Sequence, residues 1–169
     1  VTETVRAALN ALATTHPEWT RGIANPAWFE RYSKRAEDYH LPKGKQAREE
    51  FVSTVGDDGY ALLELVCSAT APQDALALPA VDALRRTWML EYIREEGRSR
   101  WRNADEIGPP SERFNSPYDT DAHHGVKGSR NWDGYKVHLT ETCDVNTPNL
   151  ITHVMTTGGA DHAVFQWAH

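Results

Sequence analysis

The sequence SPYDTDAHHGVKGSRNWDGYKVHLTETCDVNTPNLITHVMTT, residues 116–157, carries the strongest β-strand signal of the chain. Residues 135–141 alternate apolar and polar side chains, which is the period of a half-buried strand. Residues 149–157 place apolar side chains on both sides of the pleat, which favours a strand covered on both faces. Turn formers fill residues 143–148 between them. We therefore expect a long antiparallel hairpin that starts at Gly134 and needs other elements to cover it.

The chain before the hairpin carries helix signals. We expect five or six helices over residues 2–96, with Thr2 and Asn25 as N-caps and Pro26 in the first turn of its helix. An aromatic stripe follows Pro26 and extends to His40. Such a stripe can stack on nucleic-acid bases, but at helical spacing it indicates core. The stripe consists of Trp28, Phe29, Tyr32 and Tyr39.

Two glycine positions are expected to end helices. The motif Gly-Asp-Asp-Gly at residues 56–59 predicts a break between a helix over 46–55 and an apolar helix over 60–69, which Asp58 would cap. A long amphipathic helix is expected over residues 79–96, with Gly97 as its C-terminal cap. Residues 98–131 are expected to be irregular.

The most basic neighbourhood begins after Gly97 with the sequence RSRWR, residues 98–102. Arginine can bind phosphate with two hydrogen bonds, and a tryptophan between arginines can stack on a base or pack beneath them. Arg85, Arg86 and Arg94 add to this neighbourhood, against three glutamates at 91, 95 and 96. A solvated helix end with a favourable dipole is the alternative. The candidate DNA-binding residues are Arg98, Arg100, Arg102, Lys127 and Arg130.

A second cluster has side chains that can bind metals. Asp119, Asp121, His123 and His124 lie within six residues and could hold a divalent ion, or they could simply form a polar loop. Whether they bind any ion stays open. No glycine-rich phosphate loop, paired-cysteine zinc pattern or nucleophile elbow occurs in the sequence.

Composition narrows the class of protein. The chain has 169 residues, the size of one domain, and a formal net charge of −6, so any DNA contact needs a local basic face. Cys67 and Cys143 are too few for a disulfide framework, which favours a reduced cytoplasmic setting. No apolar run approaches the roughly 20 residues that span a bilayer, and no signal peptide is visible. We expect a soluble protein without a membrane partner.

Several strings, taken in order, resemble insertion-sequence transposases of the DDE, RNase H-like superfamily, in the group with a long helical insertion in the catalytic domain. Two upstream strings are WFERY at 28–32 and LPKGK at 41–45. Three downstream strings are SPYD at 116–119, GYKVHLTETCD at 134–144 and LITHV at 150–154. The resemblance extends from about Glu3 to about His162.

The resemblance implies a parent enzyme that cuts and joins DNA at transposon ends with two divalent ions, Mg²⁺ or Mn²⁺, held by two aspartates and a glutamate. By the order of the family's motifs, the first aspartate falls before Val1 and the other two acids fall beyond His169. We therefore expect no catalytic residue, metal ligand or cofactor in this chain. Relatives carry an aspartate after the second strand beside a histidine, whereas here Ala163 follows His162. A frameshifted or decayed element would show this departure.

The expected fold class is α+β: a helical insertion region at 1–97, an irregular connection at 98–131, and at 132–169 an antiparallel hairpin from an incomplete RNase H-like catalytic domain. The chain begins with Val1 and stops soon after the hairpin, as an excerpt of a longer protein would, although a processed start also explains it. Three functions stay open. They are an inactive transposase fragment, a DNA- or protein-binding module derived from one, and a metal-dependent hydrolase using Asp119, Asp121 and the neighbouring histidines. Exposed hairpin edges would also allow self-association.

Overall fold

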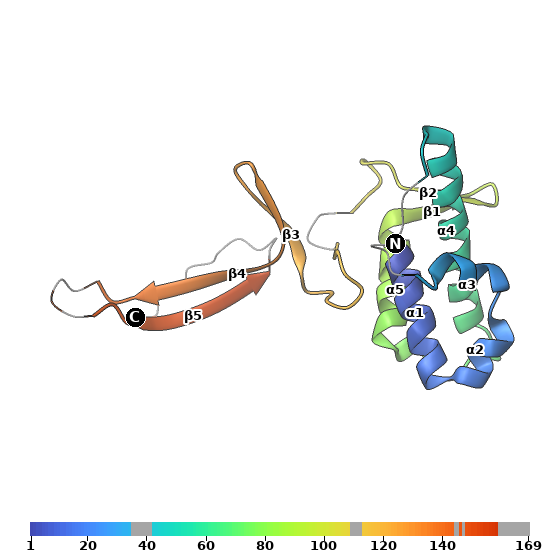
Figure 1. The fold of residues 1–169 in the computed structure, drawn as a ribbon, viewed down its shortest axis with the longest axis horizontal. Coiled ribbons are helices and arrows are strands. Elements are labelled where there is room, and N and C mark those ends of the chain that lie inside the picture. Colours follow the sequence, from blue (N-terminus) through green and yellow to red (C-terminus); the bar gives the residue numbers. More distant parts are fainter. Residues whose placement is uncertain (35–41, 109–112, 144–145, 147, 159–169) are drawn as a thin grey trace. The chain divides into compact units, whose positions relative to one another are not determined.

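A computed structural model of the chain describes residues 1–34, 42–108, 113–143, 146 and 148–158. It divides into two compact units, Val1–Gly108 and Pro109–His169, and each is described here by itself. The first holds the helices and the second the long strands (Figure 1). The described residues thus form a mixed helical and stranded structure, which confirms the α+β class. No helix among them is long and apolar enough to cross a membrane.

The first unit contains five α-helices and one 3₁₀ turn within its described residues. They are α1 (Thr2–Thr15), α2 (Pro17–Ile23), α3 (Pro26–Tyr32), α4 (Lys45–Val66), η2 (Ala75–Ala77) and α5 (Pro79–Glu91). The predicted start of α3 is confirmed, because the side chain of Asn25 accepts a hydrogen bond from the backbone N–H of Ala27 at 3.0 Å. The N-cap of α1 is Val1 and not Thr2.

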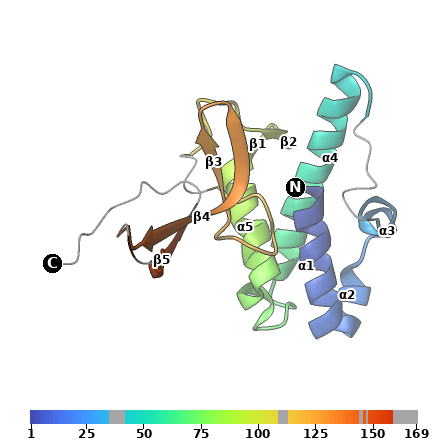
Figure 2. The ribbon, with the colours of Figure 1, turned by 60° about the vertical axis from the view of Figure 1, so that its left-hand side comes forward.

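Helices α1, α4 and α5 lie side by side (Figure 2) and enclose one hydrophobic core. The core residues are those that the helical periodicity selects, among them Val5, Leu12, Leu62, Leu84 and Trp88. Of the predicted aromatic stripe, Trp28 and Tyr32 are buried. The prediction for Phe29 was wrong, because its side chain is 77% exposed. Tyr39 and His40 lie outside the described residues.

The predicted break at residues 56–59 does not exist, because α4 runs through both glycines without interruption. These glycines give clearance to elements that pack on the helix. A Cβ on Gly59 would lie 2.0 Å from the Trp88 ring, and one on Gly56 would lie 2.5 Å from the Cβ of Ser99. The Trp88 indole N–H also donates to the backbone oxygen of Gly56 at 2.8 Å. Glycine is therefore required here for close packing and not for a turn.

Asp58 does not cap a helix but joins α4 to α3. Asp58 is a buried residue, 8% exposed, and its carboxylate accepts hydrogen bonds from the Trp28 indole at 2.9 Å and the Tyr32 hydroxyl at 2.7 Å. The Arg31 guanidinium pairs with the same carboxylate at 2.7 Å. Burial, together with the bond to Asp58, raises the pKa of Tyr32 well above its usual value.

The long helix predicted over residues 79–96 ends at Glu91. The chain then forms a hairpin of β1 (Tyr92–Glu95) and β2 (Arg98–Trp101), in antiparallel register with Glu95 opposite Arg98. Glu96 and Gly97, at φ 49° and 79°, form the two-residue turn. Gly97 is thus a turn residue and not a helix cap. Tyr92 is buried and stacks on Trp88 at a centroid distance of 4.9 Å, which anchors the hairpin.

The second unit is a three-stranded antiparallel sheet in the order β3-β4-β5, with β3 (His123–Lys127), β4 (Arg130–Glu141) and β5 (Ile151–Gly158). The predicted hairpin is confirmed as β4 and β5. It starts earlier than expected, because β4 begins at Arg130 and passes through Gly134 at φ 138°. Strands β2 and β3 also show that residues 98–131 are not irregular throughout.

The apolar face of β4 and β5 is exposed, contrary to the expectation of a covered strand. Leu139 lies opposite Val154, so the two side chains share one face. They are 60% and 58% exposed. Tyr135, Val137 and Ile151 are exposed as well.

Candidate nucleic-acid interface

The three predicted arginines of residues 98–102 lie on or directly after β2, at alternating positions. Successive strand residues point to opposite faces, so Arg98, Arg100 and Arg102 share one face. Ser99, on the other face, packs against α4, where its hydroxyl donates to the Asp57 carboxylate at 2.6 Å. The sequence indicated a basic neighbourhood in an irregular segment, and the structure instead places these arginines on a strand and just after it.

Arg100 already forms ion pairs within the first unit. Its guanidinium makes two hydrogen bonds to Glu95, at 2.9 and 2.7 Å, and two to Glu106, at 2.7 and 2.9 Å. These bonds lower the pKa of Glu95 and lower that of Glu106 to about 2, while they raise that of Arg100. Arg100 would have to exchange two carboxylates for a phosphate, so it is a weak candidate.

Other arginines of the predicted basic neighbourhood are also paired. Arg85 binds Asp82 at 2.6 Å, and Arg94 binds Glu64 at 2.7 Å. Glu64 lies on α4, distant in sequence, so no sequence pattern signalled this pair. Arg98 is exposed and has no ion-pair partner within the described residues.

The remaining candidates belong to the second unit. Lys127 and Arg130 lie opposite each other at the ends of β3 and β4, on either side of a turn that contains Gly128 at φ 62°. The Arg130 side chain is exposed. The five predicted residues are therefore divided between two units, three on the β2 hairpin and two at the β3–β4 turn.

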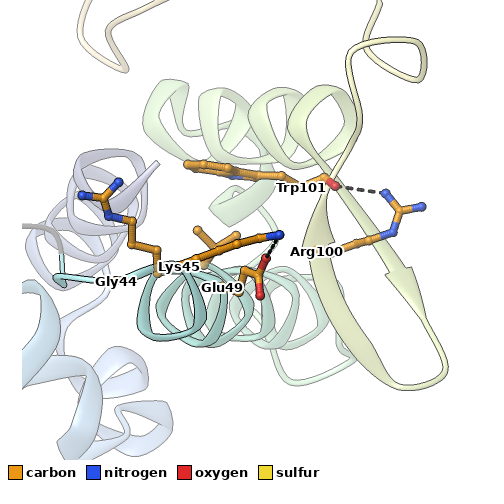
Figure 3. A pocket seen from close by; sticks show the side chains of 7 residues that line it. Gly44, Lys45, Glu49, Arg100 and Trp101 are labelled. Atoms are coloured by element: carbon orange, nitrogen blue, oxygen red, sulfur yellow. Dashed lines mark hydrogen bonds and ion pairs between the residues drawn. The ribbon is translucent and has the colours of Figure 1, made fainter.

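Sequence reasoning missed a cavity beside β2 in the first unit. We call it the Trp101 slot, a cavity of about 710 Å³ between the start of α4 and Trp101 (Figure 3). Its lining residues are Gly44, Lys45, Arg48, Glu49, Val52, Arg100 and Trp101. Gly44 and Lys45 belong to LPKGK, and Arg100 and Trp101 belong to RSRWR, but no local sequence pattern connects the two strings.

The side chains of the Asp119, His123 and His124 cluster make hydrogen bonds to neighbouring residues of the second unit. The Asp119 carboxylate accepts hydrogen bonds from the backbone N–H groups of Asp121 and Ala122, each at 3.2 Å, and from the Tyr135 hydroxyl at 2.7 Å. The bond from Tyr135 lowers the pKa of Asp119, and the same bond raises the pKa of Tyr135 to about 12. Asp119 therefore orders the turn before β3.

The two histidines of this cluster have separate partners. The Nδ1 of His123 lies 2.6 Å from the backbone oxygen of Arg113, and the Nδ1 of His124 lies 2.8 Å from the Asp133 carboxylate. Within the part of the chain that the structure describes, no three Asp, Glu, His or Cys side chains are grouped closely enough to hold a metal ion.

No protein-family model, curated protein or solved structure matches this chain.

Proposed function

We propose that this chain is a portion of a cytoplasmic DNA transposase of the DDE superfamily, comprising a helical insertion and one hairpin of the catalytic sheet. It contacts DNA but does not itself cut or join strands. The catalytic aspartates and glutamate, and the Mg²⁺ or Mn²⁺ ions that they bind, belong to the complete parent protein.

The single observation that carries the proposal is the exposed apolar face of β4 and β5. Val137, Leu139 and Val154 present branched apolar side chains to solvent on one face of an antiparallel pair. A sheet that faces water carries polar residues on that side. These side chains are therefore suited to packing beneath another layer, which a complete RNase H-like domain would supply.

The family-like strings support the same assignment by their positions. GYKVHLTETCD includes most of β4, and LITHV begins β5, so the two strings come together as paired strands. WFERY lies on α3, where three of its residues bind Asp58. The strings that resemble the transposase family thus include paired strands of the sheet and the contacts that join α3 to α4.

DNA contact is assigned first to Arg98 and Arg130. Both side chains are exposed, and within the described residues neither has an ion-pair partner. Arg102 is a weaker candidate, because its Nε is buried without a hydrogen-bond partner in the described structure. Each phosphate that an arginine neutralises releases counterions, so the binding constant should fall steeply with salt.

The test is a salt-titrated anisotropy measurement with labelled duplex DNA. We expect Arg98→Ala and Arg130→Ala each to weaken binding and to reduce the salt slope by about one unit. Arg85→Ala is the matched control, since Arg85 is an exposed arginine already paired with Asp82. Binding that none of these changes affects would remove the assigned contacts.

Catalysis is tested separately with the same DNA in Mg²⁺ or Mn²⁺. We expect no nicking or joining by the wild type. Strand cleavage that Asp119→Ala abolishes would overturn the non-catalytic assignment and favour a metal-dependent hydrolase.

A second candidate is a self-associating binding module derived from a transposase. Strands β3 and β5 form the two edges of the sheet in the described part of the chain, and such edges can pair with another copy. Light scattering over a range of concentrations distinguishes the two candidates. A stable dimer that persists without DNA would favour the second.

A further inference from the structure

The Trp101 slot is built by one face of α4. Positions 45, 48, 49, 52 and 56 recur at three- and four-residue spacing, so their side chains lie on the same side of the helix. At Gly56 this face is covered, because β2 packs against it through Ser99. Trp101 lies two residues further along β2, beside the first turns of α4. Between it and the α4 face at residues 45–52 lies the slot of about 710 Å³.

One wall of the slot is the Trp101 indole. It is held from behind by the buried Tyr92 ring at a centroid distance of 6.5 Å, and it remains 47% exposed. The opposite wall is α4, where Lys45 lies across from the indole (Figure 3) and Val52 adds an apolar side chain. An indole held in place and facing an open cavity is a surface on which a planar ring can stack.

The charges at the slot favour an anionic ligand. The Arg48 guanidinium is oriented by a neutral acceptor, since its Nε donates to the backbone oxygen of Pro42 at 3.0 Å. Lys45 is 90% exposed and only 3.7 Å from Glu49, a contact that solvent screens. Arg48 thus offers two terminal amino groups to a phosphate, while Arg100 is held by its two glutamates.

We infer that the Trp101 slot binds an unpaired nucleotide of single-stranded DNA, with the base stacked on the Trp101 indole and the adjacent phosphate at Arg48 and Lys45. This inference rests on the proposed function, in which the chain contacts DNA. The slot falls within the range of volumes of small-ligand sites. A paired base cannot reach the indole because its faces are covered by its neighbours in the stack, so the slot selects single strands over duplex.

The experiment compares a labelled oligothymidylate, a duplex of equal length and free thymidine monophosphate, each titrated against the full chain. We expect the single strand to bind, and Trp101→Ala to weaken it roughly 5- to 150-fold, the range for loss of one base stack. Duplex binding should be unchanged in this variant. Arg48→Ala should reduce the salt slope by roughly 0.7.

Two controls separate stacking from damage to the fold. Trp101→Phe keeps a ring against Tyr92 and should bind between the wild type and Trp101→Ala, while Val52→Trp fills the slot and should block binding with Trp101 in place. Phe29→Ala removes an even more exposed aromatic ring elsewhere in the unit and should bind as the wild type.

The possible outcomes distinguish a failure of the Trp101 slot from a failure of the proposed DNA contact. Single-strand binding that Trp101→Ala and Val52→Trp leave unchanged overturns the slot and leaves DNA contact standing. Absence of single-strand binding with duplex binding intact does the same, whereas loss of both overturns the proposed function as well. Thymidine monophosphate that binds as tightly as the oligonucleotide overturns the assignment to a strand.

Discussion

The two units use apolar residues in opposite ways. Leu62 in the helical unit is fully buried, and Leu139 in the sheet unit is 60% exposed, yet both lie in regular elements that the sequence pattern located. The helical unit closes its own core, because α1, α4 and α5 cover one another. Among the described residues of the sheet unit, one apolar face is exposed. Amphipathic periodicity thus identifies the apolar face of a helix or strand. It does not show whether other elements of the same chain pack against that face.

The largest expected effect is on the buried carboxylate of the helical unit. Asp58→Ala should destabilise the unit by about 3–5 kcal/mol, because it leaves the Arg31 charge and two buried donors without their acceptor. Asp82→Ala, which removes an exposed partner of Arg85, should cost about 1 kcal/mol or less. Urea unfolding followed by circular dichroism measures both. Equal effects would mean that the Asp58 network does not hold α3 to α4.

The comparison of the two leucines can be tested directly. Leu62→Ala should cost about 2–5 kcal/mol, since it creates a cavity in a closed core. Leu139→Ala should cost about 1 kcal/mol or less, because it removes only a cross-strand contact with Val154. Hydrogen exchange of the amides in each unit reports the two losses separately. A large loss from Leu139→Ala would show that its face is covered in solution.

The glycines of the helical unit allow a finer test. Gly59→Ala should destabilise by about 1–3 kcal/mol, because the new Cβ would lie 2.0 Å from Trp88 and force the helices apart. Gly22→Ala in α2 is the control, since nothing lies within 4 Å of its Cβ position. That change should leave the melting temperature unchanged or raise it. A stabilised Gly59→Ala would indicate that the glycine serves flexibility and not clearance.

The smallest expected effect concerns the sheet unit at high pH. The bond to Asp119 raises the pKa of Tyr135 to about 12, from an ordinary value of about 10. The neutral phenol is therefore favoured in the folded chain, and its contribution is complete below about pH 10 and lost as the pH rises towards 12. Ultraviolet titration of tyrosinate, compared with Tyr135→Phe, measures this. Titration of Tyr135 at its ordinary pKa would show that the bond does not persist in solution.

The candidate site was predictable in its residue types and not in its pairing. The string RSRWR indicated arginines around a tryptophan that either stacks on a base or packs beneath them, and Trp101 is 47% exposed in the structure. It also shows Arg100 bound to Glu95 and Glu106, which lie five residues before it and six residues after it. Only the turn at Glu96 and Gly97 brings Glu95 beside Arg100, and a helix over the same residues would not.

The sequence by itself determined two local elements: the start of α3 from Asn25 and Pro26, and the β4–β5 hairpin from alternation and turn residues. These signals act between residues a few positions apart, or across one turn. Tertiary structure alone decided that α4 continues through Gly56 and Gly59 and that the chain leaves the helix after Glu91. The reason is packing with Trp88 and Tyr92 across some thirty positions of sequence, where the fit of one ring against a bare backbone outweighs the local preference of glycine to end a helix.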